Sequence, residues 1–343
     1  MDAEQVERLK AEYPVHFDPG LWEKRAELEA LAAGALGLID DAAVVGVPLG
    51  HDLVVKADAI IGGVHFFADD LPDAVAKKAL RVNLSDLAAK GAKPIGYLMA
   101  LALPAAPART WLRRFASGLD EAQRAFGCHL MGGDTDCRPG PLSLSITVFG
   151  SVPSGRMVRR GSARVGDQLF VTGTLGDAAL GLALLKEPAL AQRFDLDASQ
   201  VALMTARFLR PQPRLGLRQL LLAHASAAMD LSDGLMKDCG RMCAASGVAA
   251  SLEAAALPLN DALRKAVAED AGWLKTAASA GDDYEILAAI PTAGVADFTA
   301  KAAVLDFPVA RIGQIREGAG VRMQQPDGAD MTFDRTGWDH FLE

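Results

Sequence analysis

The residues of this chain best suited to chemistry are aspartates at the ends of expected strands and helices. They stand beside glycines or directly before helix starts: Asp40-Asp41, Asp58, Asp86, Asp134, Asp230, Asp233 and Asp282-Asp283. Carboxylate oxygens arriving from several segments are the ligands that Mg²⁺ ions take when they hold phosphate groups. The pattern therefore predicts an anion site with several metal ions.

Two neighbouring features favour the same chemistry. Gly133, within Gly132-Gly133-Asp134, lets the backbone approach a phosphate without a Cβ in the way. Ser232 precedes an expected helix, whose N-terminus attracts anions. The alternative is structural, because aspartate and glycine are ordinary residues of caps and turns. Polar residues inside the apolar run 83–89 weaken that alternative, since such local conflicts gather at functional sites. The residues alone leave both interpretations open.

Familiar signatures of other site classes are missing from the sequence. There is no G-x-x-x-x-G-K-[ST] loop, no G-x-G-x-x-G after a strand, no G-x-S-x-G elbow and no zinc spacing among the six histidines. The segment Gly173-Thr174-Leu175-Gly176-Asp177 contains glycines but is too loose for a nucleotide fingerprint. Cys239 and Cys243 lie one helical turn apart in an apolar stretch, which predicts buried thiols rather than a metal or redox pair.

Strands and helices alternate along the chain, which predicts α/β (α+β) layering in two domains. A length of 343 residues is also too great for one typical core. The expected strands are 42–47, 53–57, 97–103, 128–131, 142–151, 168–172, 227–229 and 284–290. The expected helices are 74–90, 110–126, 176–185 and 233–245, with further helix in 1–35. Pro153-Ser154-Gly155 suggests a boundary between domains 1–153 and 154–343.

Charge and hydropathy narrow the class of protein. The formal net charge is −8, and no long cluster of lysine and arginine occurs, so a nucleic-acid partner is not expected. No apolar run reaches the length of a membrane span, and the charged N-terminus lacks the apolar region of a secretory signal. We expect a cytoplasmic enzyme.

Taken as a set, the motifs resemble those of thiamine-monophosphate kinases from about Leu36 to the C-terminus. The matching segments are Asp40-Asp41-Ala42-Ala43-Val44, Asp58 with Gly63-Val64-His65-Phe66, Asn83-Leu84-Ser85-Asp86-Leu87-Ala88-Ala89, Gly132-Gly133-Asp134-Thr135, Arg160 with Gly166-Asp167, Asp230-Leu231-Ser232-Asp233-Gly234-Leu235, Gly281 with Asp283-Tyr284-Glu285, and Gly337-Trp338-Asp339-His340-Phe341. Each motif alone is weak, but their combination and order are specific.

The resemblance implies the two-domain fold of the aminoimidazole ribonucleotide synthetase-like superfamily, with an N-terminal ATP- and Mg²⁺-binding domain that also forms a homodimer, and a C-terminal α/β domain. It also implies the reaction, in which the γ-phosphate of ATP is transferred directly and in line to thiamine monophosphate, giving thiamine diphosphate. No covalent nucleophile is expected.

Site residues follow from the resemblance position by position. Expected Mg²⁺ ligands are Asp40, Asp58, Asp86, Asp134, Asp230 and Asp233. Expected ATP contacts are Gly133, Asp134, Arg160 and Ser232. Expected substrate contacts are His65, Asp282 and Trp338. Without the resemblance, His65 fits a core histidine and Trp338 an anchor for the chain end.

Three departures from the family pattern bear on the substrate and the metal. Ile39 replaces a glycine, Lys56-Ala57 replace hydroxyl residues that can bind metal, and Asp282 replaces a glutamate. A lysine ammonium at position 56 can stand in for part of an ion's charge. Two other readings therefore stay open: a related enzyme of the superfamily with another small-molecule acceptor, and a non-catalytic nucleotide-binding regulator. Retention of the matched aspartates disfavours the regulator.

Overall fold

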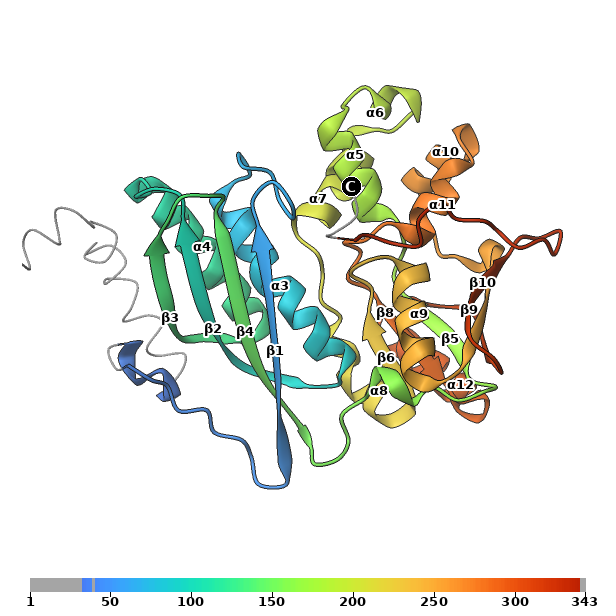
Figure 1. The fold of residues 1–343 in the computed structure, drawn as a ribbon, viewed down its shortest axis with the longest axis horizontal. Helices are drawn as coiled ribbons and strands as arrows, with labels where there is room; N and C mark the ends of the chain where they lie inside the picture. The colour runs from blue at the N-terminus through green and yellow to red at the C-terminus, as the bar shows by residue number, and fades with distance from the viewer. Residues whose placement is uncertain (1–32, 39–40, 340–343) are drawn as a thin grey trace, which may run out of the picture. The chain divides into compact units, whose positions relative to one another are not determined.

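The computed structural model describes residues 33–38 and 41–339. Contacts between residues divide the chain into two compact units (Figure 1). The first unit holds the described residues up to Leu84 together with Lys93–Ser154, and the second holds Ser85–Ala92 together with the residues from Gly155 onward. The domain boundary after residue 153 stays a prediction, because residues 85–92 belong with the second unit.

The first unit is built on a four-stranded sheet. Its strand order is β1-β4-β2-β3, and β2 and β3 run parallel while the other neighbours are antiparallel. The strands are β1 (His51–Ile61), β2 (Lys93–Leu103), β3 (His129–Cys137) and β4 (Ser143–Pro153).

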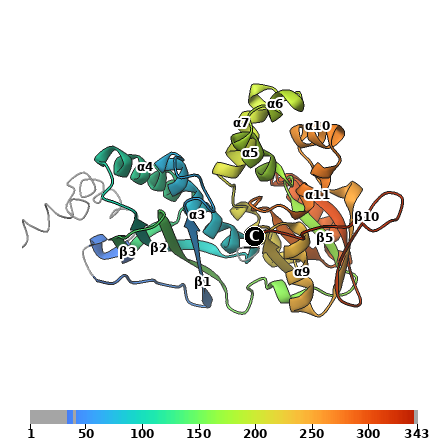
Figure 2. The same cartoon turned by 45° about the horizontal axis from the view of Figure 1, so that its top comes forward.

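Helices α3 (Pro72–Ala89) and α4 (Arg109–Phe126) cover one face of this sheet (Figures 1 and 2). On β4 the alternate residues Leu144, Ile146 and Val148 are buried against that side. The helix α4 ends as predicted at Gly127, whose φ of +60° suits glycine at a helix C-terminus. We call the face of this sheet opposite α3 and α4 the open face.

Two predictions in the first unit need correction. The strand expected at residues 42–47 is absent: Val44 bonds through its N–H to the carbonyl of Gly34, and the segment joins no sheet. Its valines favour an extended backbone, but a strand also needs a partner. The strand expected at 128–131 does not stop before the glycines, since β3 continues to Cys137.

The second unit is built on a six-stranded sheet of order β10-β7-β9-β5-β8-β6. The strands are β5 (Gln168–Thr172), β6 (Ala227–Asp230), β7 (Ala249–Glu253), β8 (Ile286–Ile290), β9 (Val309–Arg316) and β10 (Gly320–Gln324). All neighbours are antiparallel except β10 and β7, which run parallel.

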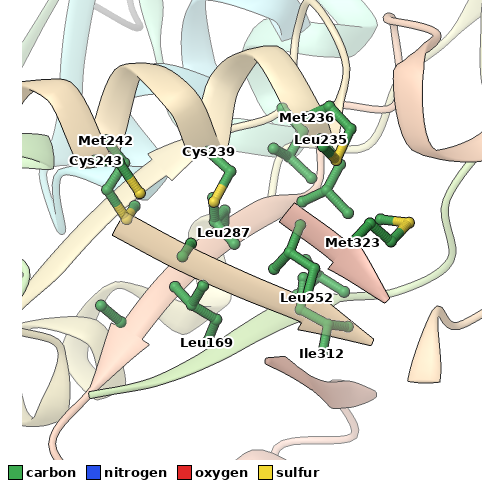
Figure 3. Packing of buried hydrophobic residues seen from close by; sticks show 14 of the residues in the cluster. Leu169, Leu235, Met236, Cys239, Met242, Cys243, Leu252, Leu287, Ile312 and Met323 are labelled. Atoms are coloured by element: carbon green, nitrogen blue, oxygen red, sulfur yellow. The ribbon is translucent and has the colours of Figure 1, made fainter. Parts of the chain in front are cut away.

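At β8 both faces of this second sheet are covered, and all five residues of the strand are buried. Leu287 and Ala289 face a cluster that includes helix α9 (Leu235–Ser246), whereas Ile286, Ala288 and Ile290 face a second cluster with helices α8 (Arg218–His224) and α12 (Val295–Val304). Figure 3 shows the first cluster, with the apolar side chains of α9 lying on the strands. The result is the layered α/β arrangement predicted from the sequence.

A third cluster joins helices at one side of the second unit. They are α5 (Asp177–Lys186), α6 (Leu190–Arg193), α7 (Ala198–Leu209), α10 (Asp261–Glu269) and α11 (Gly272–Ser279). The predicted helix at 176–185 is thus confirmed within one residue at each end.

Cys239 and Cys243 are free thiols buried in the core, also as predicted (Figure 3). Among the described helices, none has the length and apolar character needed to cross a membrane.

Candidate active site

Strand β3 carries the Gly132-Gly133-Asp134 motif in its middle. A Cβ at Gly133 would collide with the carbonyl oxygen of Met99 on β2, so the close pairing of the two strands requires glycine here. Asp134 is exposed, and one of its carboxylate oxygens accepts the N–H of Thr135 at 2.8 Å. The strand therefore presents the Asp134 carboxylate on a rigid backbone.

A hollow of about 750 Å³ lies over β2, β3 and β4 in the first unit. Its lining includes Gly133 and Asp134, the apolar side chains of Leu98 and Phe149, and Asp41. Two residues expected to contact ATP thus line one concavity, together with one member of the first aspartate pair. The other member, Asp40, lies outside the described residues.

Asp58 lies elsewhere on the same sheet. It pairs in register with Ile146 of β4, which is fully buried on the helix-covered side, whereas Asp134 pairs with the exposed Ala100 of β2. Alternation along the strands therefore places Asp58 and Asp134 on opposite faces of the sheet. Lys56, two residues before Asp58, has its ammonium 3.6 Å from that carboxylate.

His65 follows β1 and is held by two contacts. Its Nδ1 accepts the N–H of Ile61 at 3.0 Å, so in the neutral ring the proton is on Nε2. Its carbonyl oxygen accepts a hydrogen bond of 2.8 Å from the ammonium of Lys78, a lysine that is almost fully buried. The bond from Ile61 to Nδ1 therefore helps to fix the orientation of the ring.

In the second unit, the loop after β6 carries Ser232 and Asp233. The buried carboxylate of Asp238, in the first turn of α9, accepts the N–H of Ser232 at 3.0 Å and that of Asp233 at 2.9 Å. Burial raises the pKa of Asp238, although the Asp233 N–H and the Arg241 guanidinium act in the opposite direction. The Asp233 carboxylate in turn lies 2.6 Å from Arg241 and 3.3 Å from Lys237.

The turn at residues 280–284 packs directly against this loop. The N–H of Asp282 donates to the carbonyl of Ser232 at 2.9 Å, and the N–H of Tyr284 donates to that of Leu231 at 2.8 Å. A Cβ at Gly281 would collide with the same Ser232 carbonyl. Asp282 is therefore fixed beside Ser232, although the two are 50 positions apart in the sequence.

Trp338 reaches the same place from the end of the described chain. Its N–H donates to the carbonyl of Asp233 at 2.9 Å, and its own carbonyl accepts from the ammonium of Lys237. The residue is about half exposed, at 51%. Three segments thus bring Ser232, Asp233, Asp282 and Trp338 to one edge of the second unit.

Asp86 and Asp230 border this edge. Asp230 is the last residue of β6 and is buried. Asp86 belongs to the last turns of α3, where its neighbour Ser85 donates to the carbonyl of Tyr284 at 3.5 Å and Ala88 and Ala89 join the core cluster of α8 and α12. The tip of α3 therefore carries Asp86 to the turn that holds Asp282.

Arg160 is the expected site residue that the second unit does not bring to this edge. Its carbonyl accepts a bond of 3.2 Å from Ser246, and Gly161 lies against Ala245, both at the C-terminal end of α9. Ser232 precedes the N-terminal end of the same helix, which is about 18 Å long by its number of residues. Across the described residues, no group of three histidine, cysteine, aspartate or glutamate side chains is close enough to hold one metal ion.

Comparison with known proteins places this chain in a family. The model of the AIR synthase related protein N-terminal domain matches residues 39–152, and that of the C-terminal domain matches residues 164–325. The thiamine-monophosphate kinase of Caulobacter vibrioides is 40% identical over 89% of this chain and 85% of its own length. The chain belongs to the thiamine-monophosphate kinase family. The predicted family and the superfamily fold are therefore confirmed.

Solved structures agree with that assignment. The crystal structure of thiamine-monophosphate kinase from Stenotrophomonas maltophilia K279a matches with a TM-score of 0.81 and 38% identity, covering 91% of this chain and 97% of the other. A structure described as AaThiL complexed with AMPPCP and TMP matches with a TM-score of 0.74 and 32% identity, covering 88% of this chain and 91% of the other.

Two residues near the site residues were missed by the sequence interpretation, and a third was named there without a role. The missed residues are Asp238, which bonds backbone N–H groups, and Lys78, which supports His65; Asp283 was named only within its motif and also bonds backbone N–H groups. Asp238 carried a usable signal, since a carboxylate in the first turn of an apolar helix often bonds the preceding loop. Nothing in the sequence separates the buried Asp283 from Asp282 beside it.

Proposed function

We propose that this protein transfers the γ-phosphate of ATP to thiamine monophosphate, yielding thiamine diphosphate and ADP. Membership of the thiamine-monophosphate kinase family supports the proposal, as does similarity to a structure complexed with AMPPCP and TMP. The main structural support is that four expected site residues lie together at one edge of the second unit: Ser232, Asp233, Asp282 and Trp338. They include residues expected to contact ATP or its metal ions and residues expected to contact the acceptor.

On the acceptor side, three residues have chemistry that suits thiamine monophosphate. The half-exposed indole of Trp338 offers a face for a cationic or aromatic ring. The Asp282 carboxylate offsets the positive charge of the thiazolium. His65, whose ring is held by its bond with Ile61, would donate its Nε2–H to a phosphate oxygen.

On the donor side, the expected ATP contacts are Gly133, Asp134, Arg160 and Ser232. Arg160 supplies a permanent positive charge for phosphate oxygens. Gly133 also has a packing reason to be glycine, as its approach to Met99 requires. Ser232 offers its hydroxyl from a loop whose backbone Asp238 already fixes.

Magnesium prefers hard oxygen ligands such as the aspartates of this chain. The proposed ligands are Asp40, Asp58, Asp86, Asp134, Asp230 and Asp233, with Asp40 outside the described residues. Asp134 supports the fit, because its carboxylate is a hard oxygen ligand on an exposed residue and one of its oxygens is oriented by the Thr135 N–H. Bound Mg²⁺ would offset negative charge on the phosphate groups.

The transfer is direct. A phosphate oxygen of thiamine monophosphate forms a bond to the γ-phosphorus as the bond from that phosphorus to the bridging oxygen of ADP breaks. The acceptor phosphate is already ionised near neutral pH, so no side-chain nucleophile or strong base is needed. The residues of the chain act by positioning both substrates and by excluding water, which supplies much of the rate in phosphoryl transfer.

The open face of the first sheet favours a homodimer. Leu53, Val55 and Leu98 are more than one third exposed there although they are apolar. Exposed apolar patches of this kind mark interaction surfaces, and a second copy of the chain is the partner we propose. We also expect the enzyme to act in the cytoplasm, without membrane or nucleic acid.

The assay that tests the proposed function follows thiamine diphosphate by chromatography. The protein is incubated with ATP, MgCl₂ and thiamine monophosphate, and matched samples contain a chelator or thiamine as the acceptor. Formation of thiamine diphosphate only in the complete mixture supports the proposal. ATP consumption without this product contradicts it.

A related enzyme with a different small acceptor is the second candidate, favoured by the departures at Lys56 and Asp282. Thermal stabilisation separates the two. Thiamine monophosphate that raises the melting temperature at concentrations near the KM supports the first candidate. Stabilisation by ATP alone, with no effect of thiamine monophosphate, favours the second.

A further inference from the structure

The glycine loop at residues 173–177 has no ligand-binding role in the proposed site, yet it has the form of an anion cradle. Gly173 and Gly176 take the left-handed conformation, with φ of +58° and +79°. The loop leads from β5 into the N-terminus of α5, where unpaired N–H groups and the helix dipole favour negative charge.

That cradle is filled by the chain itself. The carboxylate of Asp283 accepts the N–H of Gly176 at 2.8 Å and that of Ala178 at 3.3 Å. Asp283 is only 5% exposed. A carboxylate from a segment more than 100 positions away thus occupies the place that a phosphate takes at comparable loops.

Asp283 stands in the centre of a strained turn. Asp282 before it has φ of +70° and Tyr284 after it has φ of +50°. Left-handed backbone is uncommon for residues other than glycine and costs on the order of 1 kcal/mol or more at each position. The surrounding structure must therefore hold the turn in this shape.

The next residue anchors the turn from its other side. Glu285 is fully buried and bonds the guanidinium groups of Arg207 and Arg214, the latter at 2.6 Å through Nε. The oxygen that accepts Arg214 Nε also accepts the hydroxyl of Thr172 at 2.6 Å. The start of β8 is thereby fixed, which leaves the Asp283 carboxylate to set the direction of the residues before it.

The geometry points to Asp283 as a positioning residue for the phosphate acceptor. By binding the Asp283 carboxylate, the glycine loop and the first turn of α5 hold Asp282 in its left-handed conformation beside Ser232, where it meets the positively charged part of the acceptor. This inference rests on the proposed function, since Asp282 is a substrate residue only in such an enzyme.

A residue needed for packing alone would be apolar here. Burial raises the pKa of Asp283 well above its ordinary value, and the nearby Asp177 adds to the effect, whereas the Gly176 N–H and Arg207 oppose it. The chain therefore keeps a carboxylate in a place where burial disfavours charge, a conflict typical of functional sites.

The neighbouring loop provides a matched comparison. Asp238 is equally buried and also bonds two backbone N–H groups, but it holds Ser232 and Asp233 rather than Asp282. The two buried aspartates therefore hold different loops, Asp283 the acceptor side and Asp238 the ATP side. Substituting each one separates positioning from a general loss of structure.

The test measures KM and kcat for both substrates in Asp283→Asn, Asp238→Asn and a control, Asp306→Asn. Asp306 is an exposed aspartate that also has a positive φ, and it lies just after α12. We expect Asp283→Asn to raise the KM for thiamine monophosphate about tenfold and the KM for ATP less than twofold, since it shifts the acceptor residue alone. Asp238→Asn should instead raise both KM values, because Asp238 holds Ser232 and Asp233, whose carbonyls bond Asp282 and Trp338.

A double substitution tests whether Asp283 acts through Asp282. In an Asp282→Ala background, Asp283→Asn should cause no further rise in the KM for thiamine monophosphate, because the group that it positions is gone. Additive effects would overturn the inference. Asp283→Asn alone would also overturn the inference if it raised the KM for both substrates equally. A fall in kcat with both KM values unchanged would do the same, because it indicates only less folded enzyme.

A failure of the proposed function can be distinguished from a failure of the inference about Asp283. A wild-type protein that makes no thiamine diphosphate contradicts the proposed function, whereas an active wild type with an unshifted Asp283→Asn contradicts only the inference. If Asp283→Asn does not fold, Asp283→Ser replaces it, because a serine hydroxyl still accepts one of the two N–H groups. The same selective rise in the KM for thiamine monophosphate is expected, and its absence overturns the inference.

Discussion

The two units of this protein hold their site residues in different ways. In the first unit, Asp58 and Asp134 stand exposed on strands, each fixed by its own strand and bonded to the N–H of the next residue. In the second unit, Asp233 and Asp282 stand on loops that buried carboxylates and backbone bonds hold together. Substitutions of the exposed aspartates in the first unit should therefore change activity but not the free energy of unfolding. Substitutions of the buried groups that hold the loops of the second unit should change both.

The largest effect is expected at Asp134. Asp134→Asn should lower kcat/KM by about 10³-fold, because the site loses a charged metal ligand worth several kcal/mol. Its free energy of unfolding should stay within about 0.5 kcal/mol of the wild type, as for other exposed positions. Steady-state kinetics and denaturant unfolding check both statements.

Asp136→Asn is the matched control, since Asp136 is exposed on the same strand and bonds the N–H of Cys137 at 2.7 Å in the same way. It should retain nearly full activity. Equal losses in the two variants would mean that β3 needs its charge in general, rather than Asp134 in particular.

Glu285→Gln tests the claim that buried groups stabilise the second unit. Removing the buried charge leaves Arg207 and Arg214 without their carboxylate, and breaking such a buried network costs about 3–5 kcal/mol of unfolding free energy. Glu253→Gln removes an exposed partner of Arg311 at 3.0 Å and should cost less than about 1 kcal/mol. Similar values for the two variants, measured by urea unfolding, would contradict the distinction.

A smaller effect is expected at Trp338, which is half exposed and bonds Asp233 through its backbone N–H. Trp338→Ala should raise the KM for thiamine monophosphate about tenfold, the equivalent of a lost ring contact of 1–2 kcal/mol, with little change in stability. Trp338→Phe should recover most of the loss. A change in melting temperature without a change in KM would instead identify Trp338 as an anchor of the chain end.

The smallest effect is expected at Lys56, whose ammonium lies 3.6 Å from the Asp58 carboxylate. If the ammonium supplies part of the positive charge near Asp58, Lys56→Thr should raise the Mg²⁺ concentration needed for half-maximal activity about threefold, in line with the modest energy of an exposed ion pair. Titration of activity with MgCl₂ measures this shift. An unchanged Mg²⁺ dependence would refute the substitute role of Lys56.

Local signals in the sequence predicted much of the fold. The apolar run before Pro104 gave β2, and Gly127 marked the end of α4. The strand expected at 284–290 begins only at Ile286, because Tyr284 takes a left-handed conformation that no propensity predicts. Strands β7, β9 and β10 were not predicted, since polar and charged residues interrupt the apolar pattern of their sequences.

The candidate site was predictable in its residues but not in its arrangement. The resemblance supplied Ser232, Asp282 and Trp338, but their meeting depends on backbone bonds between segments far apart in the sequence. Periodicity reports only local structure, so it cannot show such contacts. For the same reason the sequence could not show the contact of Asp283 with Gly176, which is 107 positions away.

The central claim is that thiamine monophosphate accepts the γ-phosphate of ATP on this protein. The most direct measurement is a single turnover with excess enzyme, Mg²⁺, thiamine monophosphate and ATP labelled at the γ-phosphate, followed by separation of the products. The account predicts that the label appears in thiamine diphosphate, with ADP formed in equal amount. Label found only in inorganic phosphate, or left in ATP, would contradict it.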